Sequence, residues 1–179
     1  MNAIVSLLDE EHDRQVRALW GDLEAAAGVR HLVEVIPYPH ITYHGAERYD
    51  ESRAVPLLER LARGAKPFTV TSVGMGVFTG PGPVIYLAVA RNPALQAFHD
   101  QLWREIGSAA SDQSHYYNAQ MWAPHITLAQ WDVTPQNLPR LAGLLGERRL
   151  EWEMPIDNIA LVQFTGDRYD VTHRFPFAG

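Results

Sequence analysis

The tetrapeptide PHIT occurs twice in this chain, at residues 39–42 and 124–127. Each copy lies in a segment rich in β-branched and aromatic residues, within residues 29–43 and 122–133, and such segments favour strands. Proline has no backbone N–H, so each copy fits near the start of a strand or on an edge strand. The repeat therefore predicts two comparable strands in one small fold.

Side chains alternate between the two faces of a strand. His40 and Thr42 therefore share one face, about 6.6 to 6.8 Å apart along the strand. His125 and Thr127 repeat this arrangement. The apolar partners behind them point to the opposite face: Ile41, Tyr43, Ile126 and Leu128. We expect these four to pack inside the protein and both His-Thr pairs to face a common opening.

Composition limits the class of protein. The chain has 179 residues, of which 46% are hydrophobic, as expected for one globular domain spanning residues 1–179. Its net charge of −6 argues against a broad basic surface for long nucleic acids, because such binding depends on many Lys and Arg. Without cysteine, thiol chemistry and disulfides are excluded. No signal peptide or long apolar stretch is evident, so we expect a cytoplasmic monomer that does not bind membranes.

The order of the expected elements also has two similar halves. Strands are expected over residues 3–8, 29–43, 122–133, 150–154, 156–165 and 168–175, with two more around a Gly-Pro turn within residues 66–90. Helices are expected over residues 9–27, 51–63, 92–106 and 135–145. Each half has a strand-helix-strand plan and one PHIT. This order favours an internal duplication that folds as two lobes around a cleft.

Two imidazoles and two hydroxyls that converge suit the cleavage of a phosphodiester. Histidine titrates near neutral pH, so one ring can take a proton while the other supplies one. In-line displacement at phosphorus needs a base at the attacking oxygen and an acid at the leaving oxygen. Threonine hydroxyls between them can hold the non-bridging oxygens as charge develops.

The two motifs, HITY from His40 and HITL from His125, resemble the paired HxTx signature of the two-histidine (2H) phosphoesterase superfamily. That superfamily includes bacterial 2'-5' RNA ligases and RNA 2',3'-cyclic phosphodiesterases. The resemblance implies an α+β fold with two pseudo-symmetric lobes of mostly antiparallel sheet, and flanking helices, around a central cleft. It also implies a site without metal or other cofactor, acting on an RNA end or a small cyclic nucleotide.

Carried onto this sequence, the resemblance makes His40 and His125 the catalytic histidines and Thr42 and Thr127 the phosphate-holding threonines. It further implies that His125 activates water and His40 protonates the departing 3'-oxygen, which leaves a 2'-phosphate. Reversible 2'-5' ligation is part of the same expectation. One departure concerns the substrate: where bacterial 2'-5' RNA ligases often have an arginine after the second motif, this chain has Gln130.

Four residues are expected near the substrate: His44, Tyr117, Gln130 and Trp131. By alternation His44 shares the face of His40, so it is either a rim contact or a solvated residue at the strand end, and the second interpretation is favoured. Trp131 falls on the face of His125 and is the better candidate for stacking on a base, although aromatic residues at sheet ends are more often core or rim. The polar segment 107–120 is long enough to be a lid.

Two other classes of function remain open. A metallohydrolase is disfavoured because His40 and His44 would lie about 13 Å apart along a strand, too far to share one ion. A non-catalytic nucleotide-binding module on the same fold is the stronger alternative, and the neutral Gln130 keeps it open.

Overall fold

The computed structural model describes residues 1–179 and contains two antiparallel sheets. The first has strand order β5-β2-β1-β8-β9 and the second β6-β4-β3-β7. The strands are β1 (Asn2–Leu7), β2 (His40–Tyr49), β3 (Phe68–Phe78), β4 (Val84–Val89), β5 (Ala110–Gln113), β6 (His125–Ala129), β7 (Glu153–Ile156), β8 (Asn158–Phe164) and β9 (Tyr169–Pro176). The helices are α1 (Glu10–Ala27), α2 (His31–Val35), α3 (Glu51–Gly64), α4 (Pro93–Ile106) and α5 (Leu138–Gly146).

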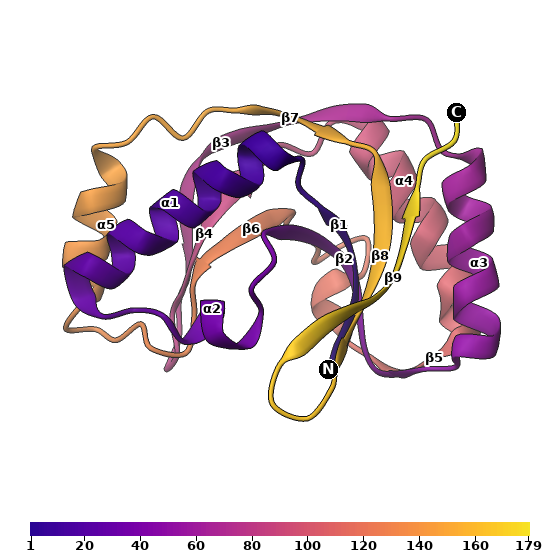
Figure 1. Cartoon of the computed structure of the whole chain (residues 1–179), viewed down its shortest axis with the longest axis horizontal. Helices are drawn as coiled ribbons and strands as arrows, with labels where there is room; N and C mark the ends of the chain where they lie inside the picture. The colour runs from indigo at the N-terminus through magenta and orange to yellow at the C-terminus, as the bar shows by residue number, and fades with distance from the viewer.

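The two sheets form two lobes, each with helices on its outer side (Figure 1). Helices α3 and α4 flank the first sheet, whereas α1 and α5 lie beside the second. One HxT motif belongs to each sheet, because β2 is in the first and β6 in the second. The expected α+β fold with two antiparallel lobes is confirmed. However, both halves of the chain contribute strands to both sheets, so the halves do not fold as separate lobes, as element order alone suggested.

Helix ends follow the expected chemistry. Asp9 caps α1 by accepting hydrogen bonds from the N–H groups of Glu11 (3.0 Å) and His12 (3.3 Å). Gly28 ends the same helix in the left-handed conformation, at φ 69°, which glycine adopts without strain. Asn92 caps α4 by accepting from the N–H of Leu95 at 2.9 Å. Local sequence therefore sets these boundaries.

Two segments differ from expectation. Residues 29–39 contain α2 rather than a strand, and the Asp132 carboxylate accepts hydrogen bonds from the first N–H groups of this turn, at Arg30 (2.7 Å) and His31 (2.8 Å). The supposed lid over residues 107–120 contains edge strand β5, which pairs with β2, and two short 3-10 turns, Gly107–Ala109 and His115–Tyr117. Long-range partners that no local pattern reveals decide both outcomes.

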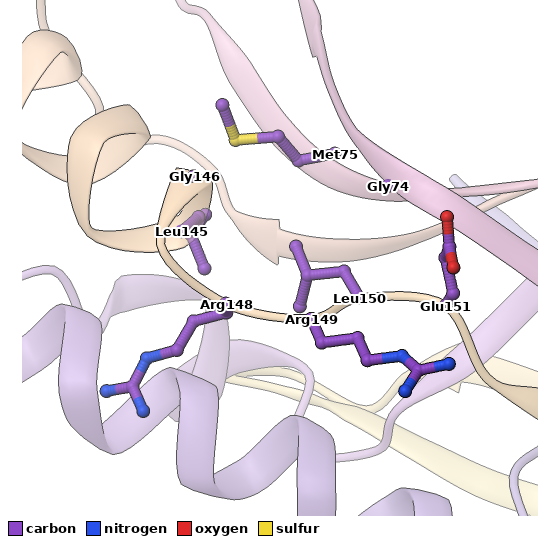
Figure 2. A pocket seen from close by; sticks show the side chains of 8 residues that line it. All are labelled: Gly74, Met75, Leu145, Gly146, Arg148, Arg149, Leu150 and Glu151. Atoms are coloured by element: carbon purple, nitrogen blue, oxygen red, sulfur yellow. The ribbon is translucent and has the colours of Figure 1, made fainter.

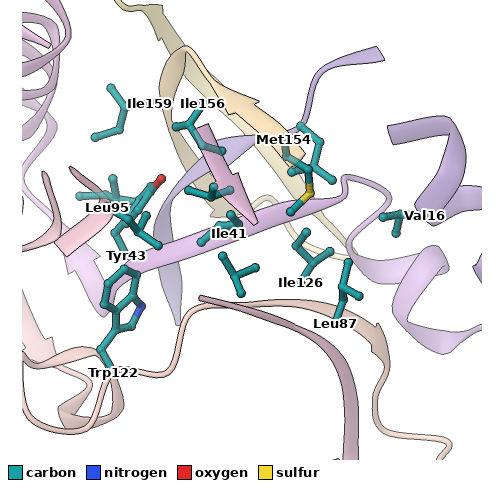
Figure 3. Packing of buried hydrophobic residues seen from close by; sticks show 14 of the residues in the cluster. Val16, Ile41, Tyr43, Leu87, Leu95, Trp122, Ile126, Met154, Ile156 and Ile159 are labelled. Carbon is teal, nitrogen blue, oxygen red and sulfur yellow. The ribbon is translucent and has the colours of Figure 1, made fainter. Parts of the chain in front are cut away.

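A single hydrophobic core of 38 buried residues joins the two lobes. Ile41, Tyr43 and Ile126 belong to it and are fully buried, as strand alternation predicts (Figure 3). Trp122 lies in the same cluster, packed against Tyr43 with ring centroids 5.9 Å apart. The strands that carry both motifs are thus held from behind by one packed interior.

No helix in the structure has the length and apolar character needed to cross a membrane.

A β-bulge in β2 changes the face on which His44 lies. Ile4 of β1 pairs with His44 and the next residue, Val5, pairs with Thr42, so Tyr43 is the extra residue. Tyr43 and His44 are both fully buried as a result. The face of Thr42 is continued by Gly45, where a Cβ would lie 2.9 Å from the Tyr117 ring.

His44 is therefore neither a rim contact nor a solvated strand end. Its Nδ1 lies 2.6 Å from the Tyr49 hydroxyl and its Nε2 lies 3.0 Å from the Gln113 side-chain oxygen. Its ring also packs on Trp103 of α4, with centroids 4.6 Å apart. Burial lowers the pKa of His44 to about 4, and the nearby charge of His99 acts in the same direction. This histidine has a structural role in the core.

We predict that the free energy of unfolding falls as pH drops from about 6.5 towards 4. The folded protein keeps His44 neutral in this window, whereas the unfolded chain protonates it, so protons favour the unfolded state. Full loss of this contribution amounts to roughly 3 kcal/mol. Urea unfolding at several pH values between 5 and 7 measures the slope, which His44→Gln is expected to flatten. His173→Gln on β9 is the control, and an unchanged slope in His44→Gln would contradict this account.

Candidate active site

The proline of each motif joins its sheet just ahead of the strand. The carbonyl of Pro39 accepts a hydrogen bond from the N–H of Leu8 at 3.3 Å. The carbonyl of Pro124 accepts one from the N–H of Val89 at 3.1 Å. Each proline thus uses its acceptor in the ladder and has no N–H to satisfy. The two motifs enter their sheets in the same way.

Both imidazoles are fixed by the same contact. Nδ1 of His40 lies 2.6 Å from the carbonyl oxygen of Tyr38, and Nδ1 of His125 lies 2.6 Å from that of Ala123. A carbonyl can only accept, so Nδ1 carries the hydrogen in both rings. Nε2 of each ring is therefore available for proton transfer. In the neutral ring it is a base, and in the charged ring it is an acid.

The backbone of each threonine is held by an indole. Trp122 Nε1 donates to the carbonyl of Thr42 at 2.8 Å, and Trp20 Nε1 donates to the carbonyl of Thr127 at 3.3 Å. The first of these bonds crosses between the lobes, because Trp122 lies two residues before the second motif and Thr42 belongs to the first. The two strands therefore share a common frame.

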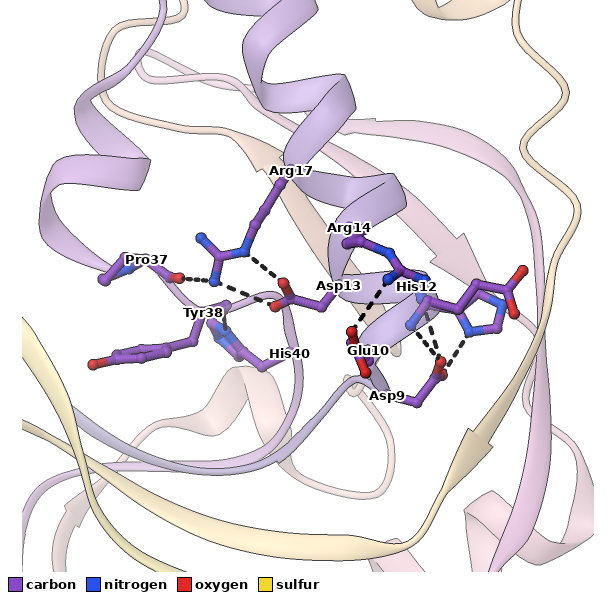
Figure 4. Close-up of polar contacts among 10 residues, drawn as sticks. Asp9, Glu10, His12, Asp13, Arg14, Arg17, Pro37, Tyr38 and His40 are labelled. Carbon is purple, nitrogen blue, oxygen red and sulfur yellow. Dashed lines mark hydrogen bonds and ion pairs between the residues drawn. The ribbon is translucent and has the colours of Figure 1, made fainter.

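Helix α1 supports the segment that leads into the first motif (Figure 4). Nη2 of Arg17 donates to the carbonyl of Pro37 at 2.6 Å, and Nε of the same guanidinium donates to the Asp13 carboxylate. The next carbonyl along the chain, that of Tyr38, is the acceptor for His40. Arg17 thus restrains the backbone that orients the first imidazole.

Both motifs line one cleft of about 710 Å³. His40, Thr42, His125 and Thr127 all contribute to its wall. The structure thus brings together two histidines that are far apart in the sequence.

Burial lowers the pKa of both histidines. For His40 the loss of solvent is the main cause, and the charge of His125 lowers the pKa further, while the hydrogen bond to Tyr38 opposes the shift. For His125 the loss of solvent again lowers the pKa, opposed by the bond to Ala123. Burial therefore favours the neutral form of each ring, and a positive charge on His125 disfavours a second one on His40.

Three of the four expected substrate contacts also line the cleft: Tyr117, Gln130 and Trp131. Burial raises the pKa of Tyr117, and a hydrogen bond with the Thr42 side chain opposes the shift. Trp131 lies beyond the end of β6 in a left-handed conformation, at φ 71°, with its ring edge against His31. A left-handed tryptophan is strained, a feature often found at functional sites. His44 is the exception, because the bulge in β2 turns it into the core.

Sequence reasoning missed an aromatic pair beside the second histidine. Phe78 stacks on Tyr86 with ring centroids 4.1 Å apart, and the two rings lie 5.0 and 5.2 Å from the ring of His125. Gly76 pairs with Tyr86 across the strands, and a Cβ there would lie 2.4 Å from the Tyr86 ring. The only sequence signal for this pair was Gly76, because a glycine within a strand often marks a place where a neighbouring group approaches the backbone closely.

A second hollow, of about 470 Å³, lies where β3 meets the connection between α5 and β7 (Figure 2). Arg148, Arg149 and Glu151 line it, together with Met75 and Leu150. Arg148 is already paired with Asp22 of α1 at 2.6 Å. Neither HxT motif reaches this hollow, so the larger cleft is the candidate site. No group of three or more His, Asp or Glu side chains is placed to hold a metal ion.

Three solved structures share the fold over nearly the whole chain. TT0787 of Thermus thermophilus is 22% identical with a TM-score of 0.61, covering 100% of this chain and 99% of that one. Escherichia coli LigT complexed with 3'-AMP is 18% identical with a TM-score of 0.63, covering 99% and 98%. LigT in its apo form is 17% identical with a TM-score of 0.58, covering 99% and 97%. No curated protein matches the sequence significantly.

The model of one protein family matches residues 8–168 and therefore includes both HxT motifs. The family is described as the 2'-5' RNA ligase superfamily. It agrees with the resemblance noted from the motifs and with the shared fold. The chain belongs to the 2'-5' RNA ligase superfamily.

Proposed function

We propose that the protein is a metal-independent phosphodiesterase that hydrolyses 2',3'-cyclic phosphate, or 2'-5' linked, ribonucleotide ends. One observation carries the proposal: both imidazoles have Nδ1 engaged by a carbonyl and line the same cleft with their threonines. This arrangement leaves Nε2 of each ring available for proton transfer to or from a group bound in the cleft. Both motifs lie in one chain, so the proposed site needs no second copy.

In the proposed reaction a water molecule attacks phosphorus and passes its proton to Nε2 of His125. The bond between phosphorus and the 3'-oxygen breaks, and that oxygen takes a proton from Nε2 of His40. The product is a 2'-phosphate with a free 3'-hydroxyl. Thr42 and Thr127 donate hydrogen bonds to the non-bridging oxygens, whose charge must be met in the transition state.

Ligation is part of the same proposal: a 5'-hydroxyl replaces water as the attacking group and passes its proton to Nε2 of His125, while the 3'-oxygen leaves with a proton from Nε2 of His40. The product is a 2'-5' diester, and the same steps in reverse cleave it. LigT has been crystallised with 3'-AMP, and this supports a nucleotide as the occupant of the corresponding cleft here. The neutral Gln130 keeps a non-catalytic nucleotide-binding module as the alternative. Turnover, as opposed to binding alone, distinguishes the two.

We predict turnover in EDTA of a nucleoside 2',3'-cyclic phosphate and of an RNA with the same end, with a 2'-monoester as product. Loss of a general acid or base lowers the rate by about 10² to 10⁴-fold, so His40→Ala and His125→Ala should each lose nearly all activity. Phosphorus NMR or chromatography identifies the monoester. His173→Ala, on β9 outside the cleft, is the matched control.

Three outcomes would contradict parts of this assignment. Loss of activity in EDTA would point to a metal. A 3'-phosphate product would mean that the bond from phosphorus to the 2'-oxygen, and not the one to the 3'-oxygen, is cleaved. Binding of the cyclic nucleotide without hydrolysis would favour the non-catalytic module.

We predict that removing either threonine hydroxyl slows the chemical step more than it weakens binding. Thr42→Val and Thr127→Val keep the branched shape of the side chain but remove a donor, which is expected to cost about 3 kcal/mol in the barrier. Steady-state kinetics should show the loss in kcat. The serine variants keep a hydroxyl and should retain most activity. Equal losses in the serine and valine variants would mean that packing, not hydrogen bonding, is what these residues provide.

The pH dependence of kcat/KM should be bell-shaped with its maximum below the ordinary histidine pKa of about 6.5. The active form has one neutral and one protonated ring, and burial lowers the pKa of both. Activity therefore falls on the alkaline side as the last ring loses its proton, and on the acid side as the base gains one. The two apparent pKa values read from this profile belong to the pair of rings and not to either ring alone. A maximum well above pH 7 would contradict this prediction.

A further inference from the structure

No Arg, Lys, Asp or Glu side chain lines the cleft. Of the 21 residues that line it, 15 are hydrophobic. The other six are His40, Thr42, Thr79, His125, Thr127 and Gln130. When one of the two imidazoles is protonated, that ring is therefore the only charged side chain among the lining residues.

Three cations next to the lining residues are paired with carboxylates, and Arg91 lies over the lining residue Trp122, 5.5 Å from its ring centroid. Arg168, which precedes the lining residue Tyr169, pairs with Asp170 at 3.0 Å. Arg30, at the start of α2, pairs with Glu34 at 3.1 Å. The amino group of Met1 lies 3.8 Å from the Glu47 carboxylate. Each of the three paired cations already neutralises a carboxylate, so a second phosphate would have to displace that partner.

The affinity of the cleft must instead come from its apolar and aromatic surface. Phe78 and Trp131 remain 37% and 49% exposed although both are large and apolar, and both line the cleft. Exposed rings grouped in a hollow are suited to a flat, uncharged group such as a nucleobase. A substrate with one charge, at the reacting phosphate, and uncharged groups around it would match such a wall.

We propose that the cleft selects substrates whose only phosphate is the reacting diester, typified by a nucleoside 2',3'-cyclic phosphate with an unphosphorylated 5' end. This inference rests on the proposed function and narrows its substrate class. A further phosphate brings negative charge against apolar walls without a partner, which is unfavourable. The reacting diester, by contrast, is matched by the one imidazolium.

Three adenosine 2',3'-cyclic phosphates test the inference: one with a 5'-hydroxyl, one with a 5'-phosphate and one with an uncharged 5'-sulfamate of similar size. We expect kcat/KM for the 5'-phosphate to lie at least about tenfold below that for the sulfamate, because no cation offsets the added charge. The KM of the 5'-hydroxyl compound should change little between about 0.05 and 0.5 M salt, since a single charge pair is involved. Equal or faster turnover of the 5'-phosphate would overturn the inference.

A variant of the wall provides a second test. Gln130→Arg adds a cation to the cleft lining and should raise the ratio of kcat/KM for the 5'-phosphate to that for the sulfamate by about tenfold. Gln130→Met is the matched control of similar length and should leave this ratio low. An unchanged ratio in Gln130→Arg, together with a wild-type preference for the 5'-phosphate, would exclude charge as the basis of selection.

The proposed function and this inference fail in different ways. If none of the three compounds is hydrolysed, the proposed function fails. Calorimetry with the same compounds then still decides the inference, with weaker binding of the 5'-phosphate expected and equal or tighter binding overturning it.

Discussion

The site depends on one repeated contact, the hydrogen bond from each imidazole Nδ1 to the carbonyl two residues earlier in the chain. Without it each ring could rotate and exchange tautomers, and neither nitrogen would have a defined role. The residue between donor and acceptor is proline in both motifs. Proline fixes its own φ and restricts the preceding residue to extended conformations, so the acceptor carbonyl is held before the histidine is placed. The dipeptide Pro-His thus encodes both the ring and its support.

Packing behind the strands converts these local restraints into a common site. Ile41 and Ile126 are fully buried in the core shared by both lobes. Interiors are packed as densely as organic crystals, so a shift of one strand disturbs the other. The indole of Trp122 adds a polar connection, because it is buried and donates across the lobes to Thr42. Few routes therefore remain by which the two histidines can separate while the core stays intact.

The sequence was informative where chemistry is local and periodic. Asp9, Gly28 and Asn92 mark helix ends that the structure confirms, and the repeated PHIT places one histidine on each sheet. Alternation failed at His44 because one extra residue in β2 reverses the face of everything after it, and a bulge depends on the pairing with β1. The aromatic pair beside His125 was hidden for a similar reason, since it is created by strand pairing. Contacts between distant segments are thus what local patterns could not supply.

Burial of the two histidines suits the proposed base but opposes the proposed acid. Loss of solvent favours the neutral ring, which suits a base, but it disfavours the protonated ring that an acid requires. An anionic phosphate between the rings stabilises the imidazolium again, so the proposed substrate itself creates the charged partner. The empty cleft then carries little charge, and the acid is formed mainly when a suitable anion is bound. Because the two histidines are the only ionisable side chains with a pKa near neutrality that line the cleft, the protonation state of the pair depends on the bound anion.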